Sequence, residues 1–179
     1  MIDGYRIRLA LPQDTTFLPS IERQAAKLFE NCLGETGLTL EALVRVNSVE
    51  NFDHAQRAGR LWVAVSPRGD LVGFALVFDL GGMAHVDELD VLPEHGGRGL
   101  GSRLLEEVCG WAREAGYPKV TLSTFREVPW NAPFYHRRGF RIVEPAELSE
   151  QHVQLVRSEK DRGLRTDLRV VMGYRIQAG

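Results

Sequence analysis

The sequence predicts an α/β fold of the α+β kind: one central, mixed and mostly antiparallel sheet with helices on both faces. The apolar stretches 61–65, 71–78 and 84–92 follow one another across short, turn-rich links, which is typical of consecutive antiparallel strands. Residues 84–125 then read as strand, helix and strand, a crossover that makes its two strands parallel. With 179 residues, one domain spanning 1–179 is expected.

The first part of the chain, about 14–50, is predicted to be mostly helical. Before it, residues 5–9 alternate apolar and charged side chains, as an edge strand with one buried face does. Asp14 or Thr15 is expected to cap the helix that follows, and Thr39 to begin a second, short helix. After the crossover, we expect a helix introduced by residues 129–131, a polar and partly helical segment 145–162, and a last strand over 169–176.

The stretch 86–105 combines the end of a strand, a proline stop and a glycine-rich turn that opens a helix. Pro93 ends the strand because it cannot donate to a sheet ladder. The turn contains Gly96, Gly97, Gly99 and Gly101. These glycines let the backbone turn sharply and approach a ligand closely. Unpaired N–H groups at a helix start bind phosphate, and Arg98 adds a bidentate donor. The sequence therefore predicts an anion site; the alternative is a turn that needs glycine only for its geometry.

Two common phosphate motifs do not fit this turn. It lacks the Gly-Lys-Ser/Thr of a P-loop. In the dinucleotide fingerprint, Ser102 would hold the third glycine position when counting starts at Gly97, and Leu104 when it starts at Gly99. A nicotinamide-dependent oxidoreductase is therefore disfavoured.

The segment resembles the GCN5-related N-acetyltransferases (GNAT superfamily), which carry Val-x-Pro and then Gln/Arg-x-x-Gly-x-Gly/Ala opening a helix. Here these motifs read Val91-Leu92-Pro93 and Gly96-Gly97-Arg98-Gly99-Leu100-Gly101, with Gly96 in place of the usual Gln or Arg. His95 or Arg98 could brace the turn instead. The later family motif Asn-x-x-x-Tyr-x-x-x-Gly-Phe is matched by Asn131, Tyr135, Gly139 and Phe140. The clear match covers residues 60–143.

The resemblance implies that the core, about 60–143, binds acetyl-CoA. The pyrophosphate would lie on the backbone amides of 97–102, and the pantetheine arm between strands 84–92 and 120–125, which splay apart in the family. The residues expected to contact the coenzyme are Leu89, Val91, Gly96, Gly97, Arg98, Gly99, Leu100, Gly101, Ser102, Asn131 and Phe134. A backbone N–H near Val91 would face the thioester carbonyl, and Asn131 would contact the pantetheine or cap its helix.

Acetyl transfer to an amine needs a base for the ammonium proton and an acid for the departing thiolate. Strict strand alternation puts His85, Asp87 and Leu89 on one face and Val86, Glu88 and Asp90 on the other. We expect the cleft on the side of Glu88 and Asp90. Glu88 is the predicted base, with His85, Asp87 or a water as alternatives. The resemblance gives Tyr135 the role of acid in a direct transfer without an acyl-enzyme.

The acceptor wall is expected from the helices at 14–50 and from aromatic side chains after strand 120–125. Phe125 and Trp130 are the candidates, although core packing explains them nearly as well. Glu22, Glu30 and Glu35 could meet a cationic acceptor, but each is by default a solvated helix residue. His136, Arg137 and Arg138 are expected to form a solvated basic face, although one of them could meet a coenzyme phosphate. The acceptor is an amine whose identity the sequence does not predict.

Composition narrows the function classes further. The hydrophobic fraction is 44%, the charged fraction 26% and the net charge −2, so nothing suggests nucleic-acid binding. No apolar run is long enough to span a membrane and no signal peptide is evident, so the cytoplasm is expected. Cys32 and Cys109 predict no disulfide framework, and no His or Cys spacing suggests a metal. Family members are often homodimers, but no pattern assigns an interface. The second function class is a non-catalytic coenzyme A-binding sensor or partner-binding module.

Overall fold

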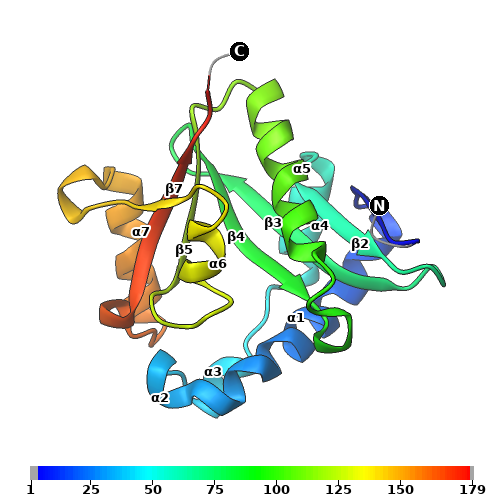
Figure 1. Ribbon diagram of the computed structural model, residues 1–179, viewed down its shortest axis with the longest axis horizontal. Coiled ribbons are helices and arrows are strands. Elements are labelled where there is room, and N and C mark those ends of the chain that lie inside the picture. Colours follow the sequence, from blue (N-terminus) through cyan, green and yellow to red (C-terminus); the bar gives the residue numbers. More distant parts are fainter. Residues whose placement is uncertain (1–3, 178–179) are drawn as a thin grey trace.

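The computed structural model describes residues 4–177 and contains a seven-stranded mixed sheet (Figure 1). Its strand order is β1-β2-β3-β4-β5-β7-β6. The strands are β1 (Arg6–Leu9), β2 (Leu61–Val65), β3 (Leu71–Asp79), β4 (Ala84–Val91), β5 (Lys119–Phe125), β6 (Arg141–Ile142) and β7 (Arg169–Arg175). Only β4 and β5 pair in parallel, and all other neighbours among the described strands are antiparallel. This confirms the predicted mixed sheet, its hairpins and its crossover.

Helices cover both faces of the sheet. They are α1 (Leu18–Ala26), α2 (Leu33–Thr36), α3 (Leu40–Leu43), α4 (Val49–Arg57), α5 (Leu100–Glu114), α6 (Ala132–His136) and α7 (Glu150–Asp161). The 3₁₀ segments are η1 (Pro12–Phe17), η2 (Lys27–Cys32), η3 (Pro93–His95), η4 (Pro145–Glu147) and η5 (Thr166–Leu168). The crossover helix α5 packs on one face, whereas α1 and α4 pack on the opposite face (Figure 1). Among the described helices, none is both long enough and apolar enough to cross a bilayer.

The start of the first helix differs from the prediction, because its expected cap has other partners. Helix α1 begins at Leu18, and its capping residue Phe17 makes no side-chain bond. The Asp14 carboxylate instead pairs with Arg8 at 2.6 Å and accepts a hydrogen bond from the Leu11 amide at 2.7 Å. It therefore closes η1 and holds it to β1. The predicted cap at Thr39 is confirmed, since its hydroxyl accepts from the Ala42 amide at 3.1 Å.

Helix α4 is an element that the sequence analysis did not predict. Its start is marked by Ser48, whose hydroxyl accepts a hydrogen bond from the Asn51 amide at 3.3 Å. The helix buries Phe52, which packs edge-on against Phe74 of β3 with 5.2 Å between the ring centroids. Burying a side chain of this size contributes about 1.5–3 kcal/mol. Because α4 and α5 cover opposite faces of β2, all five residues of that strand are buried.

The parallel pair β4 and β5 separates partway along its length. The two strands pair at three positions, where Ala84, His85 and Val86 lie opposite Val120, Thr121 and Leu122. Beyond Val86 the described ladder ends, and β4 remains paired only with β3. On that side Leu76 lies opposite Glu88 and Val77 opposite Val86, so Asp87 is an extra residue in a β-bulge. The expected splay is therefore present, and it begins at the bulge.

Candidate active site

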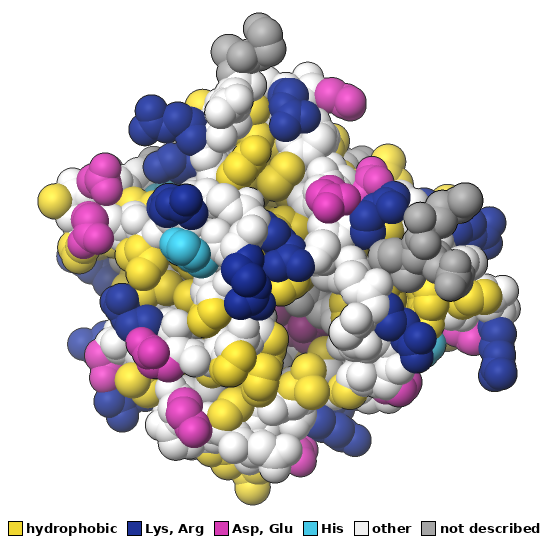
Figure 2. Space-filling view, viewed as in Figure 1, with side chains coloured by type: hydrophobic (Ala, Val, Ile, Leu, Met, Phe, Trp, Pro, Cys, Tyr) yellow, Lys and Arg dark blue, Asp and Glu magenta, His cyan; other side chains and the backbone are white. Residues whose placement is uncertain are grey.

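The gap between β4 and β5 opens into a pocket of about 1090 Å³. Its walls come from β4, β5, the start of α5, α6, the segment from α1 to α4, and the end of α7. Figure 2 shows a hollow near the middle of one face, with acidic atoms at depth and basic side chains beside it. A second, shallower hollow of about 440 Å³ lies near Arg60 and Tyr117 and contains none of the predicted site residues. The larger pocket is therefore the candidate site.

The glycine-rich turn presents free backbone donors to this pocket. Gly97 and Gly99 have φ values of 70° and 81°, a left-handed conformation that favours glycine. The first helical hydrogen bond of α5 runs from the Arg103 amide to the Gly99 carbonyl at 3.1 Å. The amides of 99–102 consequently donate to no acceptor within residues 4–177. A row of unpaired N–H groups at the positive end of a helix of 15 residues suits a phosphate.

His95, in η3 at the start of this turn, is held by a residue from the beginning of the chain. Its Nδ1 atom is hydrogen-bonded to the hydroxyl of Tyr5, which lies just before β1. Gly96, which follows, lacks the Gln or Arg side chain of the family pattern. The hydrogen bond between Tyr5 and His95 supports the turn next to this position. Arg98, the other suggested brace, is exposed and does not line the pocket. Its contact with the coenzyme stays a prediction.

Arg138 is the cation that lies at the turn, and the default prediction of a solvated face is wrong for it. Its Nε donates to the Ser102 hydroxyl at 2.9 Å, and a second guanidinium nitrogen also contacts that oxygen. The guanidinium lies 3.6 Å from the centroid of the Phe134 ring and donates to the Phe134 carbonyl at 2.9 Å. Positions 134 and 138 are one helical turn apart, which is the local signal that could have identified this pair.

The bulge changes which side chains of β4 share a face. Strict alternation predicts that Asp87 points away from Glu88, and the structure shows this prediction to be wrong. The positive charges of Arg162 and Arg169 act on the Asp87 carboxylate. The ring centroids of His85 and of His152 in α7 lie 6.0 Å apart. The extra residue brings both side chains to the face that also carries Glu88 and Asp90, next to α1 and α7. Leu89 keeps its predicted orientation toward the opposite face, against Gly101 of α5.

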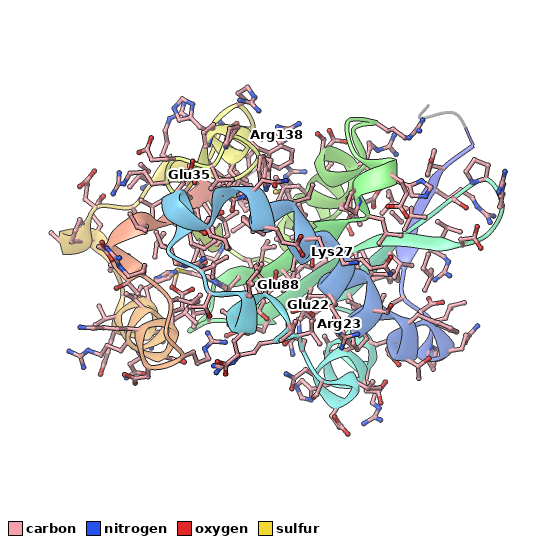
Figure 3. The ribbon with its side chains drawn as sticks, turned by 90° about the horizontal axis from the view of Figure 1, so that it is seen from below. Glu22, Arg23, Lys27, Glu35, Glu88 and Arg138 are labelled. Carbon is pink, nitrogen blue, oxygen red and sulfur yellow. The ribbon has the colours of Figure 1, made fainter. Side chains whose placement is uncertain are left out.

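Five carboxyl groups therefore line the pocket, of which Glu159 pairs with Arg169. The other four form a carboxylate cluster: Glu22, Asp87, Glu88 and Asp90. In Figure 3, Glu22 of α1 and Glu88 of β4 lie close to each other. Burial and then the repulsion from Asp90, Asp87 and Glu22 raise the pKa of Glu88 well above its usual value. Burial and the charge of Glu22 do the same for Asp90. Each carboxylate thus holds a proton more strongly than it would in water, which suits a base that must take one from an ammonium.

Glu22 of α1 is the member of the carboxylate cluster that comes from outside the sheet. Both its oxygens accept from the Asn47 amide, at 3.0 and 3.2 Å. Burial raises the pKa of Glu22 to about 7 despite those hydrogen bonds. Of the three glutamates considered for the acceptor wall, it is the one that lines the pocket, whereas Glu30 and Glu35 are exposed and lie outside it.

His85 lines the pocket as an uncharged group. It is 2% exposed, and its Nδ1 lies 2.9 Å from the Thr121 hydroxyl. Burial, followed by the influence of His152, lowers its pKa to about 3. Such a ring accepts a hydrogen bond but takes a proton poorly at neutral pH. Among the described residues, no group of three or more His, Cys, Asp or Glu side chains could hold a metal ion.

Tyr135 and Asn131 lie on the opposite side of the gap, at and just before α6. The Tyr135 ring is 8% exposed and packs against Phe134 and Phe140. Burial and the nearby Glu88 and Asp90 raise its pKa, so the phenol stays protonated. Asn131 does not cap α6, as one prediction had it. Its side-chain oxygen instead accepts from the Thr124 hydroxyl of β5, and the residue lines the pocket.

The predicted aromatic residues do line the mouth of the pocket. Phe29 of η2 contacts both of them, with centroid distances of 5.6 Å to Phe125 and 5.9 Å to Trp130. The Arg169 guanidinium also lies over the Phe125 ring, 4.8 Å from its centroid. Trp130 is 43% exposed whereas Phe125 is 5% exposed, so the wall extends from a buried ring to a surface one.

Comparison with known proteins agrees with this geometry. A family model described as "Acetyltransferase (GNAT) family" matches residues 24–140. A glucosamine 6-phosphate N-acetyltransferase from Trypanosoma brucei brucei is 35% identical over 85 residues, which cover 44% of this chain and 56% of that relative. The chain thus spans little more than half the length of this curated relative.

Solved structures share the fold over nearly the whole chain. A PaiA N-acetyltransferase from Thermoplasma acidophilum in complex with coenzyme A has a TM-score of 0.71 at 17% identity, covering 96% of this chain and 98% of that one. An N-acetylglutamate synthase from Neisseria gonorrhoeae, complexed with coenzyme A and N-acetyl-glutamate, has a TM-score of 0.70 at 21% identity, covering 97% and 35%. At these identities, the likeness establishes the fold.

Proposed function

We start from the finding that the chain belongs to the acetyltransferase (GNAT) family, and we propose that it transfers the acetyl group of acetyl-CoA to a primary amine. The observation that supports this most is the meeting of three features in one pocket. These are the free amides of the glycine-rich turn, the gap between β4 and β5, and the carboxylates that face Tyr135. In this proposal residues 1–179 form one N-acetyltransferase domain.

The coenzyme side is formed by α5, α6 and β4. The amides of 99–102 and the Arg138 guanidinium would hold the pyrophosphate, since both are donors suited to phosphate oxygens. The pantetheine arm would lie along the edge of β4 that β5 leaves unpaired after Val86. A backbone N–H near Val91 would then donate to the thioester oxygen, where negative charge grows during attack.

The acceptor side supplies the proton transfers. A primary amine is mostly protonated at neutral pH and has to lose a proton before its nitrogen can attack. Glu88 would accept that proton, directly or through a water. The nitrogen then forms a bond to the acetyl carbon and the carbon–sulfur bond breaks. The Tyr135 hydroxyl would give its proton to the departing thiolate, and no acyl-enzyme is formed.

The relatives support a small amine as the acceptor class. One is a glucosamine 6-phosphate N-acetyltransferase, and the other was solved with N-acetyl-glutamate. Both names describe a small molecule whose nitrogen carries or receives an acetyl group. A small amine is also consistent with the pocket, because its volume of about 1090 Å³ would be shared between the coenzyme arm and the acceptor.

Two measurements test the proposal. Isothermal titration with acetyl-CoA and with coenzyme A should give micromolar binding, and binding should weaken in Gly99→Ala, because φ of 81° strains a side chain there. Gly116→Ala is the matched control, since φ is 80° at that residue just beyond the end of α5. Thiol release with a panel of primary amines then measures transfer. Tight binding without thiol release for any amine would favour the non-catalytic coenzyme A-binding module.

A further inference from the structure

We propose that the acceptor amine also carries an anionic group, a carboxylate or a phosphate, and that Arg162 binds that group. The inference rests on the proposed function, because it concerns the acceptor half of the same pocket. It makes Arg162 a specificity-determining residue, distinct from the residues that transfer protons.

The charges of the acceptor half are divided between two regions. Glu22, Asp87, Glu88 and Asp90 form one, and their carboxylates attract an ammonium group. Arginines form the other: Arg45 follows α3, Arg162 ends α7 and Arg169 begins β7. A pocket with an acidic and a basic region complements a molecule that carries both charges.

Two of these three arginines are already occupied by protein groups. The Arg169 guanidinium pairs with Glu159 at 3.0 Å, donates to the Ser123 carbonyl at 3.1 Å and stacks on Phe125. Arg45 pairs with Glu41 at 3.3 Å and donates to the backbone carbonyl of residue 162 at the same distance. These contacts leave each of the two with fewer unpaired N–H donors than Arg162 has.

Arg162 is the exception. Its Nε, the guanidinium nitrogen bonded to the side-chain stem, donates to the Ser158 carbonyl at 3.3 Å. The two terminal nitrogens donate to no acceptor within residues 4–177. The residue is exposed and lines the pocket, and its positive charge partly opposes the burial that raises the pKa of Asp87. A planar pair of free N–H donors is the arrangement that binds a carboxylate or phosphate with two hydrogen bonds.

The same charges disfavour the obvious competing acceptor, a diamine. Its reacting nitrogen would fit near Glu88 and Asp90, but its second ammonium would extend toward the mouth and approach Arg162. That contact is repulsive, and Arg162 has no ion pair among the described residues to neutralise it. An anionic group in the same place would gain a partner.

The test compares acceptors that differ only in the anionic group. The probes are glycine against glycinamide, glucosamine 6-phosphate against glucosamine, and putrescine as the diamine. We expect kcat/KM to be at least about tenfold higher for the anionic member of one pair, because hydrogen bonds to a charged group contribute about 1.5–3 kcal/mol. The first pair tests a carboxylate and the second a phosphate. Equal values within both pairs, or a preference for putrescine, would overturn the inference.

Variants of α7 assign the effect to one side chain. In Arg162→Gln, KM for the preferred anionic amine should rise about tenfold or more while kcat changes little, and the neutral partner should be unaffected. Arg157→Gln is the matched control, because that arginine is exposed on the same helix and does not line the pocket. An equal loss for charged and neutral acceptors would mean that Arg162 has only a structural role.

A binding measurement separates this inference from the proposed function. Titration of each amine into the protein saturated with coenzyme A requires no turnover. If no amine is acetylated but an anionic amine binds and Arg162→Gln weakens that binding, the proposed function fails and the inference holds. If amines are acetylated and Arg162→Gln changes neither binding nor KM, the function holds and the inference fails.

Discussion

The hydroxyl of Tyr5 lies 2.7 Å from Nδ1 of His95, and this hydrogen bond joins the start of the edge strand to the glycine-rich turn. The two rings also meet edge to face, with 5.7 Å between their centroids. The turn has glycine where the family pattern has a longer side chain, and this contact reaches it from outside the motif. Tyr5, just before β1, thus contacts the glycine-rich turn of the candidate site from the far end of the sheet.

Removing that hydroxyl should weaken coenzyme binding. In Tyr5→Phe the ring packing is retained, but the turn loses a hydrogen bond worth about 0.5–1.5 kcal/mol. We expect Kd for coenzyme A to rise about two- to tenfold by isothermal titration. Tyr174→Phe is the control, because Tyr174 packs against Phe140 away from the turn. Unchanged affinity in Tyr5→Phe would show that the turn holds its shape alone.

Arg138 should matter more for coenzyme affinity than its neighbour in the sequence. Arg138→Gln removes the cation that contacts Ser102 at the start of α5, and a charged hydrogen bond to phosphate contributes about 1.5–3 kcal/mol. Kd for coenzyme A should therefore rise at least about tenfold, with a weaker salt dependence of binding. Arg137→Gln, which changes an exposed residue, serves as the comparison. Similar affinities in the two variants would remove Arg138 from the phosphate site.

Tyr135→Phe tests the proposed acid. The ring would keep its contacts with Phe134 and Phe140, so folding and coenzyme binding should be retained. Loss of the proton donor should lower kcat about 10²-fold or more, measured by thiol release. Because its pKa is raised, wild-type Tyr135 should lose no activity by deprotonation up to its ordinary value of 10. Undiminished turnover in the variant would exclude Tyr135 from the mechanism.

The carboxylate cluster should set the pH dependence of the reaction. The acidic limb of kcat/KM should lie above 4.5, the ordinary pKa of a glutamate, because burial and neighbouring charges raise the pKa of Glu88. Asp90→Asn removes the neighbouring charge that raises the pKa of Glu88 most, so the acidic limb should shift to lower pH. The pH profile of kcat/KM for one amine measures this shift. A limb that stays in place would mean that another group limits the rate.

Glu22 should cost stability at high pH. Its pKa rises from 4.5 in the unfolded chain to about 7 in the folded protein, so the folded state binds its proton more tightly. Stability should fall as pH rises from 4.5 to 7 and stay low above that. At pH 8 the free energy of unfolding of Glu22→Gln, measured by denaturant titration, should therefore exceed that of wild type by about 1–3 kcal/mol. At pH 4 the two free energies should be equal. Glu30→Gln, exposed in η2, should show no such difference.

The sequence predicted the parts of the site that depend on neighbouring residues. The glycine-rich turn, the end of β4 at Pro93 and the place of Tyr135 follow from short motifs, and all line the pocket as expected. The pairing from β2 to β5 was predictable as well, because short links favour antiparallel pairing and the crossover helix requires a parallel pair. The place of β7 between β5 and β6 was not predicted.

Features that depend on distant partners could not be predicted in this way. The bulge at Asp87 exists only in the register between β3 and β4, and one extra residue was enough to bring Asp87 to the face of Glu88. Glu22 and Tyr5 reach the site from segments far from either motif. Asp14 has the composition of a helix cap, but a salt bridge to Arg8 holds it elsewhere.

The short ladder between β4 and β5 also has a consequence for ligand binding. The ladder joins two parts of the sheet, one formed by β1 to β4 and the other by β5 to β7. The two parts are paired near Ala84 and are separated near Val91. Beyond this ladder, the backbone groups that β4 and β5 turn toward each other pair with no other described strand, so they stay available to a ligand lying between the two parts of the sheet.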